Sequence, residues 1–309
     1  MALLFYSTAD SAKVWIPELE RQLSHHDIRQ WPDIGDPSEI DYALLWKPEP
    51  GIMAALPNLK VIFSIGAGID HLVKDPDMPR HLPLVRMVEE GLTAGMTEYV
   101  VMQTLYHHRR MLDYRELQAE QHWEPLPLTP CWDRKVGILG LGVLGRDSAE
   151  KLAMLGLDVA GWSRSEKQID GVKCYHGEEG LQEVVARSEI LICLLPLTDE
   201  TRGILNADLF NRMPRGGMII NAARGEHLVD QDLLDALASG QIDSATLDVF
   251  HEEPLPANHP FWNHRRIILT PHMASITVPR TAVASLVDNV KRFEAGQPMK
   301  NLVDLDRGY

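Results

Sequence analysis

VGILGLGVLG, from Val136 to Gly145, is the stretch of this sequence that decides its fold. Its apolar first half predicts a buried strand, and a helix-forming segment follows it. The first glycine would permit a tight turn, the second would let the backbone approach a pyrophosphate, and the third would let helix and strand pack closely. The pyrophosphate of a dinucleotide would then lie on the amides of the helix N-terminus. The cofactor-binding residues expected here are Gly140, Gly142, Val143, Leu144 and Gly145.

Apolar runs on both sides of this turn predict a doubly wound α/β fold. About 135 residues precede the turn, so another α/β domain comes first. We expect buried strands at residues 3–7, 42–46, 61–65, 136–139, 157–162, 190–195, 218–221, 245–249 and 267–270. Helices are expected at 12–23, as one long helix at 97–121, after the glycine turn, between the later strands and at 280–294. Asp230 and Gly240 are expected as an N-cap and a C-cap, and Gly156 as a helix-ending residue.

The composition, with 45% hydrophobic and 24% charged residues, is that of a globular protein. A length of 309 residues favours two domains. The net charge of -14 argues against a nucleic-acid partner, which would need a basic patch. No apolar run is long enough to span a bilayer, and the N-terminus lacks the basic region and apolar core of a signal peptide. We therefore expect neither a nucleic-acid nor a membrane partner.

The three cysteines are odd in number and far apart. They indicate a reducing compartment without a disulfide framework or a zinc site, so we expect a cytoplasmic protein. No metal-ligand pattern includes the histidines expected on exposed helix or loop surfaces, which are His25, His26, His107 and His108. We expect no catalytic metal.

The turn after the second strand of the dinucleotide fold indicates which cofactor binds. A carboxylate that accepts hydrogen bonds from the hydroxyls of the adenosine ribose is usual there, but this chain has Ser163, Arg164 and Ser165. A guanidinium between two hydroxyls suits a 2′-phosphate, which a carboxylate would repel. We therefore expect NADP(H) in preference to NAD(H). The alternative is an ordinary exposed arginine in a surface turn.

Three later segments, NAARG at 221–225, LDVFHEEP at 247–254 and TPH at 270–272, resemble the catalytic segments of the D-2-hydroxyacid dehydrogenases in order and spacing. The resemblance covers nearly the whole chain. Within that family the chain resembles the bacterial glyoxylate/hydroxypyruvate reductases of the A type. This likeness is carried by YALLW at 42–46, GAGID at 66–70, WSR at 162–164 and RGY at 307–309.

The resemblance implies three catalytic residues. Reducing a 2-oxo acid needs a proton for the carbonyl oxygen, and His272 is the expected general acid. Glu253 would orient its imidazole; the adjacent Glu252 competes for this role, but the acid of the family directly precedes the proline. Arg224 would bind the substrate carboxylate and polarise the carbonyl. The alternative for Arg224 is a salt bridge at a strand end.

The remaining expected contacts also follow from the resemblance. For the cofactor they are Leu195, Pro196, Leu197, Ala222 and Asp248, of which Asp248 would hold the nicotinamide carboxamide, and Thr97 is a further candidate. For the substrate they are Ala67 and Gly68, whose amides could form an anion nest, and Trp46, which would limit the pocket. A tight strand-to-helix turn and a core tryptophan are the structural alternatives for these residues.

The resemblance implies a split architecture of two Rossmann-like or flavodoxin-like domains. Residues 1–95 and 278–309 would form the substrate domain, and residues 96–277 the inserted NADP-binding domain. The active site would lie in the cleft between them, closing by hinge motion to exclude water. The long helix after Thr97 is where family members dimerise, so a homodimer is expected.

The expected activity is the NADPH-dependent reduction of glyoxylate to glycolate and of hydroxypyruvate to D-glycerate. One alternative is another D-2-hydroxyacid dehydrogenase, of the D-lactate or phenylpyruvate type. The other is a non-catalytic, dinucleotide-sensing protein that keeps the fold as a scaffold, since fold alone does not decide function.

Overall fold

The computed structural model describes residues 1–305, so the RGY sequence at 307–309 lies outside the described residues. The chain divides into two compact units. Unit 1 comprises Met1–Leu92 and the segment from Ile276 onward, and unit 2 comprises Thr93–Ser275. The roles of substrate domain and NADP-binding domain, with boundaries near 95 and 277, remain predictions.

Unit 1 is built on a parallel sheet with the strand order β2-β1-β3-β4-β5. Its strands are β1 Ala2–Ser7, β2 Asp27–Gln30, β3 Ile40–Trp46, β4 Val61–Ser64 and β5 Leu84–Val85. Its helices are α1 Ala12–Gln22, α2 Asp70–Val73 and α9 Pro279–Glu294. The chain leaves β1 in one direction to reach β2 and in the other to reach β3, which is the flavodoxin-like order.

The core of unit 1 joins the two ends of the chain. Leu3 and Phe5 of β1 and Trp15 of α1 pack in one apolar cluster with Val283 and Leu286 of α9. A second apolar cluster is formed by the alternate residues of β1, β3 and β4, which point to the opposite face of the sheet; it includes Leu4, Leu45 and Ile62. The sheet is therefore buried on both faces, as its continuous apolar strands require.

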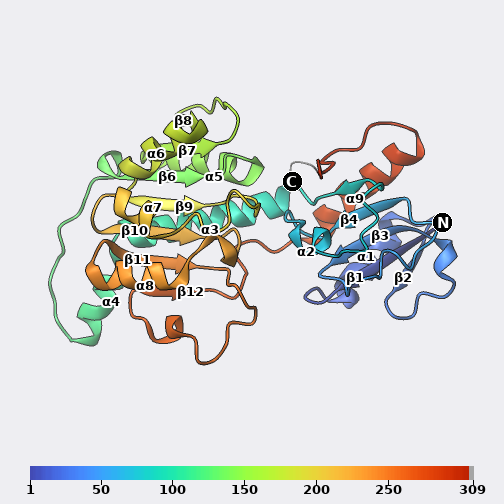
Figure 1. Ribbon diagram of the computed structural model, residues 1–309, viewed down its shortest axis with the longest axis horizontal. Helices are drawn as coiled ribbons and strands as arrows, with labels where there is room; N and C mark the ends of the chain where they lie inside the picture. Colours follow the sequence, from blue (N-terminus) through green and yellow to red (C-terminus); the bar gives the residue numbers. More distant parts are fainter. Residues whose placement is uncertain (306–309) are drawn as a thin grey trace. The chain divides into compact units, whose positions relative to one another are not determined.

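Unit 2 is built on a seven-stranded parallel sheet with the order β12-β11-β10-β9-β6-β7-β8 (Figure 1). Its strands are β6 Lys135–Leu139, β7 Asp158–Ser163, β8 Lys173–His176, β9 Ile190–Cys193, β10 Gly217–Asn221, β11 Ile242–Leu247 and β12 Ile267–Leu269. Its helices are α3 Glu90–His108, which begins in unit 1, α4 Met111–Ala119, α5 Val143–Met154, α6 Gly177–Arg187, α7 Ala207–Arg212 and α8 Asp230–Ser239. Separate apolar clusters lie on its two faces. The predicted doubly wound α/β fold is confirmed.

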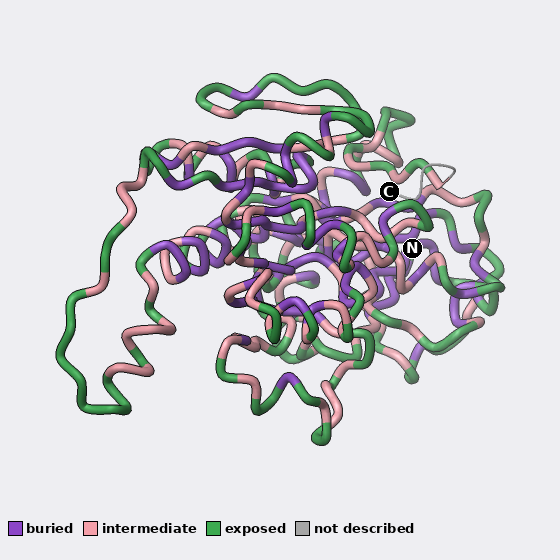
Figure 2. The backbone as a smooth tube through the Cα atoms, turned by 60° about the vertical axis from the view of Figure 1, so that its left-hand side comes forward, coloured by how far each residue is buried: buried purple, intermediate pink, exposed green. Residues whose placement is uncertain are grey.

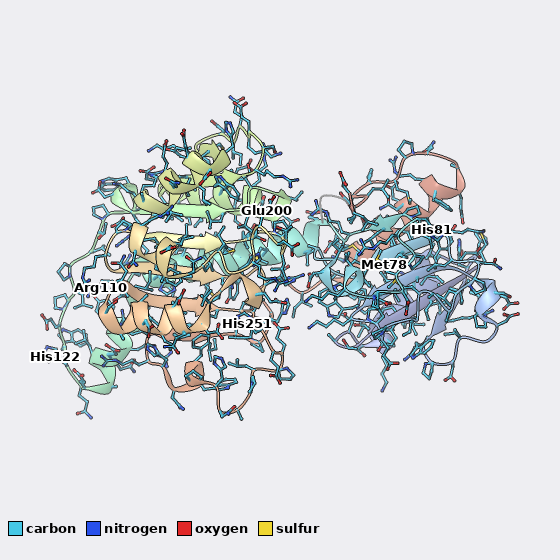
Figure 3. The ribbon with its side chains drawn as sticks, in the orientation of Figure 1. Met78, His81, Arg110, His122, Glu200 and His251 are labelled. Carbon is cyan, nitrogen blue, oxygen red and sulfur yellow. The ribbon has the colours of Figure 1, made fainter. Side chains whose placement is uncertain are left out.

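The expected long helix at 97–121 is wrong, because α3 and α4 are separate. Arg110 lies between them with a φ of 57°, a left-handed conformation that interrupts the helix. The turn lets α4 pack back on the sheet edge, where Asp113 pairs with Arg266 at 2.6 Å. After α4 an exposed, extended segment leads to β6 (Figure 2), while Arg110 and His122 are labelled on either side of α4 in Figure 3.

Three of the histidines expected to be exposed are not. His107 is 3% exposed and lies between Ser244 and Thr246 of β11, at 3.1 and 2.8 Å from its two ring nitrogens. His108 is also buried, and the His26 side chain is largely covered where it meets Glu294. The helical pattern could not separate a polar surface from a buried polar contact between α3 and the sheet.

Two predicted helix ends are confirmed. Gly240 caps α8 with a φ of 72°, and Gly156 follows α5 with a φ of 83°. Asp230 is the first residue of α8 and Val229 is its cap, one position from expectation. Within residues 1–305 we find no helix with the length and apolarity needed to cross a membrane.

Candidate active site

The carboxyl ends of β6, β7 and β9 meet where the chain order of the unit 2 sheet reverses. The chain runs from β6 outward to β7 and β8, then returns to β9 on the other side of β6. The Gly140 amide donates to the Trp162 carbonyl at 2.9 Å, and a Cβ on Gly140 would lie 2.7 Å from the Leu194 carbonyl oxygen. Such a reversal point is where ligands bind in open α/β sheets.

The glycine turn itself fits a dinucleotide. A Cβ on Gly145 would lie 1.8 Å from the Gly140 carbonyl oxygen, so only glycine permits this contact. Gly142 caps the 12-residue helix α5, and a Cβ there would meet nothing within 4 Å. Val143 is exposed and Leu144 half-buried beside it. Space is therefore open beside Gly142 at the helix N-terminus, where a pyrophosphate would bind.

The other expected cofactor residues lie at neighbouring strand ends. Arg164 and Ser165 are exposed after β7, and the Ser163 hydroxyl closes their turn by donating to the Ser165 carbonyl at 2.7 Å. Pro196 and Leu197 are half-buried in the loop after β9, whereas Leu195 is buried. Ala222 is also buried, directly after β10.

His272 and Glu253 form a hydrogen-bonded pair. The Nδ1 atom of His272 lies 2.8 and 3.0 Å from the two carboxylate oxygens of Glu253. Both side chains are partly exposed, at 30% and 21%. Because a carboxylate accepts, Nδ1 carries a proton and Nε2 is the ring atom left to serve a ligand. Glu252 is exposed and does not make this contact.

Asp248 holds the backbone on both sides of His272. His272 has a φ of 51°, unusual for a residue with a side chain, and its amide donates to the Asp248 carbonyl at 2.8 Å. The buried Asp248 carboxylate accepts from the Met273 and Ala274 amides, each at 2.9 Å. These bonds hold the His272 backbone in its left-handed conformation.

A hydroxyl chain from α3 completes this support. Thr270 donates to the Asp248 carboxylate at 2.6 Å, and the Tyr99 hydroxyl lies 2.6 Å from the Thr270 oxygen. Burial raises the pKa of Tyr99, so its hydroxyl stays protonated at neutral pH. Sequence reasoning missed Tyr99, because no local signal connects it with a strand end 171 residues later.

Arg224 follows β10 in a tightly fixed turn. Asn221 donates its side-chain amide to the Arg224 carbonyl at 2.9 Å and accepts from the Ala223 amide at 3.2 Å. A Cβ on Gly225 would lie 2.0 Å from the carbonyl carbon of Phe250. This contact, which only glycine allows, brings the Arg224 turn against the segment that carries Glu253.

That segment is also tied to the start of α8. His251, labelled in Figure 3, places Nε2 2.8 Å from the Leu228 carbonyl oxygen and 3.5 Å from the Asp230 carboxylate. His259 approaches the other oxygen of Asp230 at 3.3 Å. Among the described residues, no group of histidines, cysteines and carboxylates is arranged to hold a metal ion.

Thr97 lies in α3, well inside the helix that it was expected to open. It is buried and donates to Asp147 of α5 at 2.6 Å, so its side chain joins two helices.

In unit 1, Trp46 ends β3 and packs on His71 with ring centroids 4.3 Å apart. A Cβ on Gly66 would lie 2.5 Å from the Trp46 ring. The half-buried Ala67 and Gly68 follow in the same loop, which Ser64 closes by donating to the Gly68 carbonyl.

Comparison with known proteins extends these observations. The chain is 43% identical to glyoxylate/hydroxypyruvate reductase A of Yersinia enterocolitica over the full length of both proteins. The fold matches a D-isomer specific 2-hydroxyacid dehydrogenase of Xanthobacter autotrophicus, in complex with NADPH and MES, with a TM-score of 0.96, 42% identity, and coverage of 100% of this chain and 99% of that one. It also matches an NADPH-dependent glyoxylate/hydroxypyruvate reductase of Sinorhizobium meliloti, in complex with NADP and sulfate, with a TM-score of 0.92, 39% identity, and 100% and 99% coverage.

Residues 101–274 match the family model described as D-isomer specific 2-hydroxyacid dehydrogenase, NAD binding domain. This match takes in the glycine turn, the Arg224 turn and the His272–Glu253 pair. With the full-length relatives, it shows that the chain belongs to the D-isomer specific 2-hydroxyacid dehydrogenase family.

Proposed function

We propose that this protein is an NADPH-dependent reductase of small 2-oxo acids, converting glyoxylate to glycolate and hydroxypyruvate to D-glycerate. The observation that carries the proposal is the His272–Glu253 pair, on a loop fixed by Asp248, with the Arg224 turn packed against the Glu253 segment. The names of the full-length relatives support the same substrates.

In the proposed mechanism His272 donates its Nε2 proton to the carbonyl oxygen of the substrate. Glu253 holds the other ring nitrogen and stabilises the imidazolium before the transfer. Arg224 pairs with the substrate carboxylate and favours the negative charge that develops on the carbonyl oxygen. When bound, NADPH supplies the hydride that reduces the carbonyl carbon. From the family resemblance, Ala67, Gly68 and Trp46 are further substrate-binding residues.

We propose that the turn of Ser163, Arg164 and Ser165 confers the preference for NADPH, as the NADPH and NADP complexes of two relatives support. Arg164→Asp replaces a phosphate-binding cation by a group that repels phosphate. The expected result is a shift of at least about tenfold toward NADH in the ratio of kcat/KM for the two cofactors. Lys167→Asp, at an exposed position nearby, is the matched control for a general charge effect. An unchanged NADPH/NADH ratio in the Arg164 variant would refute the phosphate assignment.

The activity is tested by following NADPH absorbance with glyoxylate, hydroxypyruvate, pyruvate and phenylpyruvate, and then repeating the series with NADH. Fast turnover of the first two acids with NADPH is expected. A preference for phenylpyruvate would keep the mechanism and remove Trp46 as a limit on substrate size. No turnover with any acid would favour a dinucleotide-sensing scaffold instead.

Arg224→Ala tests the proposed substrate site. Loss of this charged contact should lower kcat/KM about a hundredfold, equivalent to ~3 kcal/mol. NADPH binding, measured by fluorescence titration, should stay close to wild type. Turnover within a few-fold of wild type would show that Arg224 does not bind the reacting acid.

We also propose a cytoplasmic homodimer. Large apolar side chains of α3, α4 and the extended segment are exposed, including Met102 at 53%, Trp123 at 98% and Trp132 at 70%, and burial in a second copy would remove them from water. Light scattering should give twice the 34.8 kDa of the chain. A monomer at micromolar concentration would contradict this. The small, odd number of cysteines in the sequence supports a reducing compartment.

A further inference from the structure

His227 is buried between the two loops that the proposed mechanism assigns to different ligands. It has no exposed surface, and it is the last residue of a 3-10 turn, Gly225–His227. Its Nε2 atom lies 3.2 Å from the carbonyl oxygen of Pro196, in the loop after β9. Its Nδ1 atom lies 3.2 Å from the backbone nitrogen of Arg224, in the turn after β10. One imidazole thus spans two neighbouring strand ends.

The partners determine where the proton lies on this ring. A carbonyl oxygen only accepts, so Nε2 carries the hydrogen and donates to Pro196. Nδ1 lies 3.2 Å from both the backbone nitrogen and the carbonyl oxygen of Arg224. With the hydrogen of the neutral ring on Nε2, Nδ1 is bare and accepts from the Arg224 amide. Burial lowers the pKa of His227, although the carbonyls of Pro196 and Arg224 oppose that effect, and the ring is therefore neutral near pH 7.

The atoms around the imidazole leave it little freedom. The Pro196 carbonyl also accepts from the Thr201 hydroxyl at 2.7 Å, and the His227 carbonyl accepts from the Leu205 amide at 2.8 Å. The Arg224 carbonyl is held by Asn221, and Gly225 is packed against Phe250. Backbone hydrogen bonds from Gly203 to Glu226 and from Leu205 to His227 join the same two segments farther along the chain. The imidazole is the side chain that links the Pro196 carbonyl directly to the Arg224 turn.

We propose that His227 is a positioning residue that couples the cofactor loop at Pro196 to the substrate-binding turn at Arg224. It touches neither ligand and acts through two backbone groups. This inference rests on the proposed function, because it assigns Pro196 to the cofactor and Arg224 to the acid. It predicts that the Nε2 bond to Pro196 affects binding of the cofactor and that the Nδ1 bond to Arg224 affects binding of the acid. Substitutions that remove one bond at a time should therefore change one Michaelis constant at a time.

Two substitutions remove one bond each. In His227→Asn the amide oxygen can replace Nδ1 as acceptor for Arg224, but the side chain is too short to reach Pro196. In His227→Gln the terminal NH₂ can replace Nε2 as donor to Pro196, and the Arg224 amide loses its acceptor. We expect His227→Asn to raise KM for NADPH about tenfold with KM for glyoxylate nearly unchanged, and His227→Gln to do the reverse and lower kcat/KM for glyoxylate about tenfold.

The controls separate this role from general stability. His25→Gln, at an exposed position of unit 1, should leave both Michaelis constants unchanged. Folded His227 variants in which both constants stay at wild type, or rise together by the same factor, would overturn the coupling. If only one variant folds, that variant is enough to test the coupling, because in each variant only one of the two Michaelis constants should change. A wild-type protein without 2-oxo acid turnover would instead defeat the proposed function, and this is seen before any substitution is made.

Discussion

Glu252 and Glu253 are identical side chains at adjacent positions, yet only Glu253 contacts His272. Glu253→Gln keeps a hydrogen-bond acceptor but removes the charge that stabilises the imidazolium, so kcat should fall about a hundredfold. Glu252→Gln changes the same charge on an exposed neighbour and should retain nearly full activity. Steady-state kinetics of the two variants decides the assignment. Equal losses would mean that the charge of the segment matters and the contact does not.

At this scale the sequence predicted the residues that belong to short motifs. Arg224, Glu253 and His272 stand in segments whose spacing could be recognised, and the glycine turn carries its own mechanical reason. Tyr99 and the contact of His227 with Pro196 could not be predicted, because Thr270 and Pro196 follow other strands. The contact of His227 with Arg224 is local, but an arginine followed three residues later by a histidine is not a capping-box sequence and gave no signal.

At the scale of elements, the central strands were predictable because buried parallel strands read as continuous apolar runs. The three strands that the sequence did not predict, β2, β5 and β8, lie at sheet edges and are short or partly exposed. The break between α3 and α4 was missed for another reason. It depends on a contact of Asp113 with Arg266, which lies 153 residues away.

The packing of α3 on β11 gives the protein an acid-sensitive interface. Burial lowers the pKa of His107 to about 4, whereas an unfolded histidine titrates near 6.5. As the pH falls below 6.5, the unfolded chain takes up a proton that the folded protein does not. Stability from this group is complete above 6.5 and is lost progressively toward pH 4, by about 3 kcal/mol in total.

His107→Gln keeps polar atoms in the interface and removes the titration. Urea unfolding at pH 7 and pH 4.5 should show a smaller pH-dependent loss of stability in this variant than in wild type. His25→Gln, which changes an exposed histidine, should retain the wild-type loss. Equal losses in all three proteins would show that His107 is not the titrating group.

At the scale of the whole molecule, the two units differ in how they use the chain. Unit 2 is one continuous segment, whereas unit 1 needs α9 to cover the apolar face of its sheet. Leu286 is 1% exposed in that cluster, so Leu286→Ala should destabilise unit 1 by about 2–5 kcal/mol. Val14→Ala, at an exposed position of α1, is the matched control and should cost far less.

Calorimetry and hydrogen exchange can assign this loss to a unit. Amide protection should fall in β1 and β3 of the Leu286 variant and should be retained in β6 and β9. A uniform loss over both sheets would show that the two units unfold as one.

The packing of α9 with α1 on the unit 1 sheet also has a consequence for the order in which the chain folds during synthesis. At about 5–20 residues per second, the 183 residues of Thr93–Ser275 take the ribosome roughly 10–40 s to make. During that interval the first ninety-two residues have been made without the helix that covers their sheet, and the inserted unit is still being synthesised. A growing chain therefore spends this time with the apolar sheet face that α9 later covers still open to water.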